Sequence, residues 1–164
     1  VAITQEATIE IPESWVLHQG PVYGIEAQSP DFSQIAPTGP GDYPVLSGTR
    51  LTVQRVTDNA GNDTVGQWRT WTDCNAERKE RGDNISCSSE LISIPNGSGK
   101  MQREIVPQPY DGTTYHPLHL FRFVVSQNGE SYIGMIESLD GKTESFARAI
   151  AESVVVDASI APPQ

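Results

Sequence analysis

The clearest alternation of apolar and polar residues along the chain runs from Thr49 to Thr57. Leu51 and Val53 occupy positions on one face of an extended segment, whereas Arg50 and Thr52 occupy positions on the other. A period of two is typical of a strand that buries one of its faces. The pattern therefore predicts a half-buried β-strand over 49–57.

A second pattern, from 119 to 137, predicts a β-hairpin. Asn128 and Gly129 are the residues that a type I′ turn favours, because both central positions of that turn need a positive φ. A turn centred there places Gln127 opposite Glu130. One face of the hairpin then carries Phe121, Phe123, Val125, Tyr132 and Ile136, and the other carries Leu120, Val124, Ile133 and Met135. Because both faces are apolar near the turn, we expect the hairpin inside a sheet that is covered, at least in part, on both sides.

A third pattern, near the C-terminus, has the spacing of a helix. Apolar and small residues recur three and four positions apart at Thr143, Phe146, Ala149, Ile150, Ser153 and Val154. This spacing predicts an amphipathic helix, and Thr143 or Asp140 would cap its start.

Shorter strands are predicted over 8–11, 22–27, 90–94 and 100–106. The segment 65–72 is compatible either with a strand or with the start of a short helix, and the Pro-rich segments 33–43 and 107–117 are predicted to be loops. Together these elements predict an α+β fold. We expect an antiparallel sheet of about six or seven strands with a C-terminal helix packed on it. The chain would form one domain over 1–164, with terminal tails at 1–7 and 158–164.

The charge balance excludes some classes of partner. The formal net charge is −10 at pH 7, from 21 acidic and 11 basic residues. Nucleic-acid binding needs clustered Lys and Arg, so no nucleic acid is expected as a partner. No run of about 18 apolar residues is present, so the chain is not expected to span a membrane.

The two cysteines, Cys74 and Cys87, flank a polar, charged segment. A free cysteine is usually buried, so this setting favours a disulfide between them over two reduced thiols. A disulfide would indicate an extracytoplasmic location: secreted, periplasmic or lumenal. The chain begins with Val1 rather than Met, which fits a processed or a truncated chain.

Four aromatic residues are candidates for ligand binding: Trp68, Trp71, Tyr110 and Tyr115. Aromatic side chains exposed in loops can stack on sugars or contact proteins. The alternative for the two tryptophans is a place in the core.

A turn-like cluster of oxygen-bearing side chains, Asp58, Asn62 and Asp63, could bind Ca²⁺. It departs from EF-hand spacing, and turns use Asn and Asp for backbone reasons alone. Apart from Ca²⁺ at this cluster, no cofactor is expected.

Read in order, the chain resembles the PsbP-like superfamily. The resemblance rests on a strand that runs into Pro12 to Trp15, a second strand that ends at Ser29-Pro30, the hairpin from Phe121 to Ile136, and a closing helix near Phe146 that ends in the apolar run 153–156. It implies an antiparallel sheet flanked by helices, in a protein that binds or scaffolds rather than catalyses. It implies no catalytic residues.

These observations favour an exported, non-enzymatic binding or accessory domain. Its partner would be a protein or small ligand of the cell envelope, contacted through segments 31–44 and 107–118. One alternative is a secreted carbohydrate- or Ca²⁺-dependent recognition module. The other is a small hydrolase with a Ser-His-Asp triad. The three residues of a triad meet only in the folded protein, so no fixed sequence spacing would reveal them.

Overall fold

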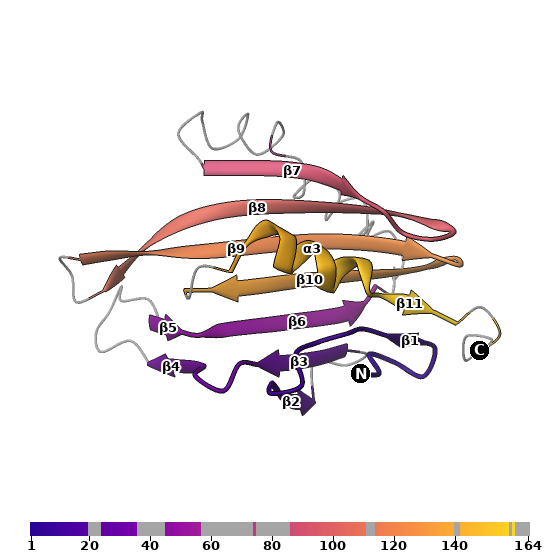
Figure 1. The fold of residues 1–164 in the computed structure, drawn as a ribbon, viewed down its shortest axis with the longest axis horizontal. Coiled ribbons are helices and arrows are strands. Elements are labelled where there is room, and N and C mark those ends of the chain that lie inside the picture. The colour runs from indigo at the N-terminus through magenta and orange to yellow at the C-terminus, as the bar shows by residue number, and fades with distance from the viewer. Residues whose placement is uncertain are drawn as a thin grey trace.

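A computed structural model describes most of the chain (Figure 1). The described residues are 1–19, 24–35, 45–56, 74, 86–110, 114–139, 142–157 and 159. Segment 57–73, which contains Trp68, Trp71 and the predicted Ca²⁺ ligands, lies outside this set.

The centre of the fold is a seven-stranded sheet in which every pair of neighbouring strands is antiparallel. Its strands, in spatial order, are β2 (Val16–Gln19), β3 (Gly24–Gln28), β6 (Thr49–Arg55), β10 (Glu130–Ser138), β9 (Thr114–Gln127), β8 (Gly97–Tyr110) and β7 (Ser86–Ile92). Two small sheets accompany it: β1 (Ala7–Thr8) with β11 (Val155–Val156), and β4 (Ser33–Ile35) with β5 (Val45–Ser47). One helix, α3 (Glu144–Glu152), lies near the C-terminus. The predicted class, a mainly antiparallel sheet with a C-terminal helix, is confirmed.

The hairpin of β9 and β10 has the predicted turn and register. Asn128 and Gly129 have φ angles of 52° and 82°, and Gln127 pairs with Glu130. Gly134 is needed on β10, because a Cβ there would lie 2.0 Å from the ring of Phe123. The residue without a side chain therefore makes room for the Phe123 ring of the neighbouring strand.

One face of the sheet, here called the helix face, carries the main core. Phe121, Phe123, Val125, Tyr132 and Ile136 are fully buried there. They belong to the same buried cluster as Ala147, Ile150 and Ala151 of α3, and α3 crosses in front of β9 and β10 (Figure 1). On the opposite face Val124 and Ile133 are also buried, as the apolar pattern on both faces of the hairpin predicted.

The start of α3 was predicted correctly, but its buried face is partly different. Thr143 is the N-cap and its hydroxyl accepts a hydrogen bond from the Phe146 amide at 3.3 Å. Ala147 and Ala151 are buried, whereas Ala149, which the spacing placed on the buried face, is exposed. The error has a simple cause: closely spaced alanines fit either side of a helix, so their pattern alone does not select one.

Residues 1–7, expected as a tail, contribute to the core through Ile3 and Ala7. Glu6 is also buried, and its carboxylate accepts a hydrogen bond from Arg55 Nη1 at 2.8 Å. Arg55 Nε binds Glu130 at 2.7 Å. These two ion pairs, which share Arg55, connect the N-terminal segment to the start of β10.

The predicted loop at 107–117 was wrong, because β8 and β9 continue through it. Pro107 pairs with Pro117, and the ladder ends at Tyr110 and Thr114. The neighbouring ladders stop earlier, at Ile105 on β8 and at His119 on β9. The paired segments 106–110 and 114–118, here called the projecting ribbon, therefore have two outer edges without a described neighbour. Figure 1 shows the projecting ribbon extending beyond the sheet. Proline is tolerated on such edges, because its missing N–H removes no ladder bond if it points outward.

No helix among the described residues is long and apolar enough to cross a lipid bilayer.

Candidate functional site

The structure tests only part of the predicted site. Trp68, Trp71, Asp58, Asn62 and Asp63 lie outside the described residues, so the aromatic patch and the Ca²⁺ site stay predictions. Among the residues that are described, no three His, Cys, Asp or Glu are grouped to hold a metal ion.

Tyr110 and Tyr115 lie on the projecting ribbon rather than in a loop. Tyr110 pairs with Thr114, and Tyr115 pairs with Pro109. Consecutive pairs of an antiparallel ladder belong to opposite faces. The register therefore assigns the two tyrosine positions to different faces of the ribbon.

The predicted disulfide between Cys74 and Cys87 is present, with the two Cα atoms 5.7 Å apart. Cys87 is on β7, opposite Glu104 of β8, and Cys74 is buried. Gln102 Nε2 donates a hydrogen bond to Cys87 Sγ at 3.0 Å. The bond thus fixes Cys74 against the opposite face of the sheet.

Beside the disulfide, the opposite face contains a buried polar network that the sequence did not reveal. Gln102 is 0% exposed and Glu104 is 2% exposed. Arg122 Nη1 donates to Gln102 Oε1 and to Glu104 Oε2, both at 2.9 Å. The alternation of polar residues on β8 is typical of a solvent face, so nothing in the pattern indicates this burial.

Farther along the same face, a groove of about 210 Å³ runs between β7, β8 and β9. It is lined by Leu91, Ser98, Gly99, Lys100, Val124 and Ser126. Leu91 is 82% exposed, the highest exposure of any large apolar side chain among the described residues. Leu91 follows Cys87 by four residues on the same strand, about 13 Å along it. The groove and the disulfide therefore share one face and one strand.

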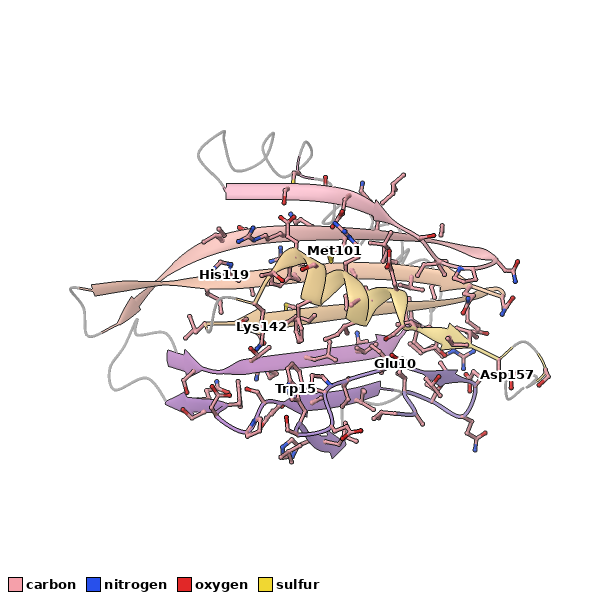
Figure 2. All side chains as sticks on the ribbon, viewed as in Figure 1. Glu10, Trp15, Met101, His119, Lys142 and Asp157 are labelled. Atoms are coloured by element: carbon pink, nitrogen blue, oxygen red, sulfur yellow. A yellow bond between two sulfur atoms is a disulfide. The ribbon has the colours of Figure 1, made fainter. Side chains whose placement is uncertain are left out.

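A second polar cluster lies on the helix face, where α3 begins. The Glu144 carboxylate accepts hydrogen bonds from Ser88 Oγ at 2.8 Å and from Arg103 Nη1 at 3.3 Å. Arg103 Nη2 lies 3.1 Å from His119 Nδ1. A cavity of about 80 Å³ adjoins this cluster, and Figure 2 shows His119 near the start of α3.

This second cluster does not have the geometry of a serine hydrolase. In a triad the serine hydroxyl is bonded to the histidine, which an acid orients in turn. Here the Ser88 hydroxyl donates to Glu144, and His119 Nδ1 faces Arg103. Because a guanidinium can only donate, Nδ1 is the acceptor in that contact.

Where a pKa shift is resolved among the described residues, it moves the pKa of the group farther from neutral pH. The hydrogen bond from Ser88, together with Arg103, lowers the pKa of Glu144. Burial raises the pKa of the Tyr132 hydroxyl. The hydrogen bond with Glu90 raises the pKa of Arg148. A general acid or base works best with a pKa near the working pH, so these groups are suited to fixed charge and hydrogen bonding.

The shift at Glu144 predicts a pH dependence of stability. Its folded pKa lies below the ordinary value of 4.5, so its contacts stabilise the fold above that value. The contribution is lost as the pH falls through the folded pKa. We expect Glu144→Gln to be less stable than wild type at neutral pH, and to lose less stability on acidification. Urea unfolding between neutral and strongly acidic pH measures both effects.

A matched control for this prediction is Glu13→Gln, a substitution at an exposed position. We expect its pH profile to parallel that of wild type. If Glu144→Gln also ran parallel to wild type, the bonds from Ser88 and Arg103 would not contribute to stability.

Comparisons with known proteins do not assign a family. No family model matches the chain, and no curated protein matches it. Among solved structures, the chain is similar to LpqN of Mycobacterium tuberculosis, described as involved in cell envelope biogenesis. The identity is 14%, the TM-score is 0.46, and the likeness covers 92% of this chain and 83% of that one. A likeness at this level shows neither a shared family nor a shared function, and the resemblance to the PsbP-like superfamily stays a prediction.

Proposed function

We propose that this protein is an exported, non-enzymatic binding or accessory domain of the cell envelope. We further propose that it contacts its partner, a protein, through the groove on the opposite face of β7, β8 and β9. The observation that carries the proposal is the setting of Leu91. A side chain of this size gains free energy when it is buried, yet it stands 82% exposed at the rim of a groove. Exposed apolar surface beside a hollow is typical of an interaction site.

The disulfide supports the extracytoplasmic location. Disulfides form and persist in oxidising compartments, and they are rare where thiols are kept reduced. The Cys74–Cys87 bond joins β7 to Cys74, which belongs to no strand of the sheet, beside the buried network of Gln102, Glu104 and Arg122. A bond in this position contributes to the structure of the binding face itself.

The pairing of charged groups supports a non-enzymatic role. Arg103 is bonded to Glu144, Arg148 to Glu90, and Arg122 to Glu104. These side chains are held by one another, and the resolved pKa shifts make proton exchange near neutral pH less favourable. The arrangement fits a scaffold that presents a surface.

Site-specific photo-crosslinking tests the proposal. A photoreactive amino acid replaces Leu91 in the cells that produce the protein, and a matched variant carries it at Val155, which is also exposed but lies on β11. We expect a discrete crosslinked product from position 91 and none from position 155. Equal crosslinking from both positions would contradict the proposed surface. Labelling of one serine by a reactive-serine probe would contradict the non-enzymatic role.

A further inference from the structure

Strand β7 forms one edge of the seven-stranded sheet. It pairs with β8 from Ser86 opposite Ile105 to Ile92 opposite Gly99. On its other side no strand of the described chain is paired with it, and Figure 1 shows it at the margin of the sheet. An edge strand offers backbone N–H and C=O groups that another chain can bind.

The hydrogen-bond phase of the sheet shows which residues of β7 offer these groups. The Val56 amide donates to the Ser131 carbonyl, so Ser131 directs its backbone groups toward β6. Backbone groups of successive residues on a strand point to alternate edges. Residues that are paired across two neighbouring strands either both direct their backbone groups toward one another or both direct them away. Applied to the registers of β10 with β9, β9 with β8 and β8 with β7, this rule directs the backbone groups of Ser88 and Glu90 toward β8.

The same alternation turns Cys87, Ser89 and Leu91 toward the other edge, where no described strand is paired with β7. Cys87 is held in the disulfide. Ser89 and Leu91 are both exposed. These two residues therefore carry the backbone groups that a further strand would meet.

Within the described chain, β7 itself lacks the sequence features that usually protect an edge strand from pairing with another chain. Natural edge strands are protected by proline, by lysine, by bulges or by inward-pointing charges. β7 contains no proline and no basic residue. Its one charged residue, Glu90, is bonded to Arg148 of α3. An apolar residue of the strand, Leu91, is 82% exposed.

We propose that the edge of β7 binds an extended segment of a partner protein as an added strand, with alternating apolar and basic residues. This inference rests on the proposed function and specifies its partner. On the opposite face, apolar side chains of the added strand would lie beside Leu91 and the groove. On the helix face, basic side chains would lie beside Glu90 and near Glu144. In this mode of recognition the main chain supplies affinity and alternate side chains supply specificity.

Charge selects a basic partner over a second copy of this chain. Each copy has a formal net charge of −10, so two copies repel one another. Among the described residues, the carboxylates of Glu90, Glu144 and Glu152 near β7 and α3 are accompanied by cationic groups of similar number, so the local charges nearly balance. The attraction for a basic segment therefore comes from the net charge of the whole protein.

Synthetic peptides test the inference on the intact protein. The probe is a labelled heptapeptide in which leucine and lysine alternate, compared with its leucine–glutamate counterpart by fluorescence anisotropy. We expect the lysine peptide to bind and the glutamate peptide to bind at least about tenfold more weakly. A lysine peptide with N-methyl groups on the alternate amides that face β7 loses ladder bonds, and we expect it to bind more weakly as well. N-methylation of the other alternate set, which faces away from β7, removes no ladder bond and is the matched control. Binding of all these peptides with equal affinity, or of none, would overturn the proposal.

A pair of substitutions at Ser89 isolates the backbone contribution. Ser89→Pro removes an N–H that points away from β8, which an edge strand tolerates, whereas Ser89→Ala keeps it. We expect Ser89→Pro to weaken binding of the lysine peptide about tenfold, because the added strand loses the hydrogen bond from the Ser89 N–H. We expect Ser89→Ala to bind as wild type does. Equal affinity of the two variants would overturn the proposal, and the N-methylated peptide on wild-type protein gives the same answer if Ser89→Pro does not fold.

Amide hydrogen exchange gives a readout at single residues. In the free protein, the amides of Ser88 and Glu90 should exchange slowly and those of Ser89 and Leu91 fast. Saturating peptide should slow Ser89 and Leu91 alone. If these two amides were already protected in the monomeric free protein, the edge would be occupied by the chain itself, and the proposal would be wrong.

The two proposals fail in different ways. If position 91 crosslinks a partner and Ser89→Pro leaves the yield unchanged, the groove binds without strand addition, and only this inference is overturned. If the lysine peptide binds with the expected exchange pattern but position 91 crosslinks nothing in cells, the proposed function is overturned. A dimer seen by sedimentation and abolished by Ser89→Pro would overturn the choice of partner, because the added strand would then come from a second copy.

Discussion

Replacing Arg122 with methionine is expected to lower the free energy of unfolding by about 3 kcal/mol, the scale of a buried ion pair that loses one partner. Glu104, which is 2% exposed, would lose the counter-charge that the Arg122 guanidinium supplies. Gln102, which is fully buried, would lose the donor to its side-chain oxygen. Urea unfolding at neutral pH measures the difference, and an unchanged slope against urea shows that the variant keeps the same fold.

The double variant Arg122→Met with Glu104→Met is the control for this prediction. Apolar residues of similar volume often replace a buried ion pair with little loss. We therefore expect the double variant to be more stable than Arg122→Met alone. If both unfolded at the same urea concentration, the cost would come from lost packing of the arginine side chain rather than from the charge left on Glu104.

Removing the disulfide is the second change with a large expected effect. Cys74 and Cys87 are 13 residues apart. In the chain-entropy model, closing a loop of this length stabilises the fold by about 3 kcal/mol. The variant with both cysteines changed to serine should lose this amount in urea unfolding. Intact mass with and without reductant, with alkylation to count free thiols, verifies that the pair is oxidised in the native protein.

Reduction provides the matched control for the disulfide prediction. Reductant should destabilise wild type to about the level of the double serine variant, and it should leave that variant unchanged. Two freely alkylated thiols in native protein would contradict the disulfide and would remove the main support for export. Because β7 holds both Cys87 and Leu91, we also expect the serine variant to crosslink less from position 91.

Several parts of the fold could be predicted from the sequence, and each depends on short stretches of chain. Asn128 and Gly129 favour the positive φ angles that the turn needs. Thr143 can cap a helix that starts at the next residue. The disulfide was predicted because Cys74 and Cys87 stand in a polar setting. The alternation over 49–57 correctly predicted that Leu51 and Val53 are buried.

The candidate site could not be predicted in the same way. Gln102 and Glu104 follow Lys100 at every second position of β8 and so resemble a solvent-facing row, yet they are buried beside Arg122 and the disulfide. Leu91 has the apolar side chain of a typical core residue, yet it is exposed at the rim of the groove. The prolines at 107 and 117 indicated a loop, yet they pair on a ribbon with open edges.

The sequence by itself determined the hairpin of β9 and β10, the start of α3, the pairing of the two cysteines and the general class of the fold. The tertiary structure alone decided the order of the strands, the position of β7 at the edge, and the burial of Gln102 and Glu104. The physical reason is the range of the interactions. Turn and cap preferences act within a few residues, whereas burial and edge position depend on which distant strands pair. Those pairings join segments such as β6 and β10 that are far apart along the chain, and no local pattern specifies them.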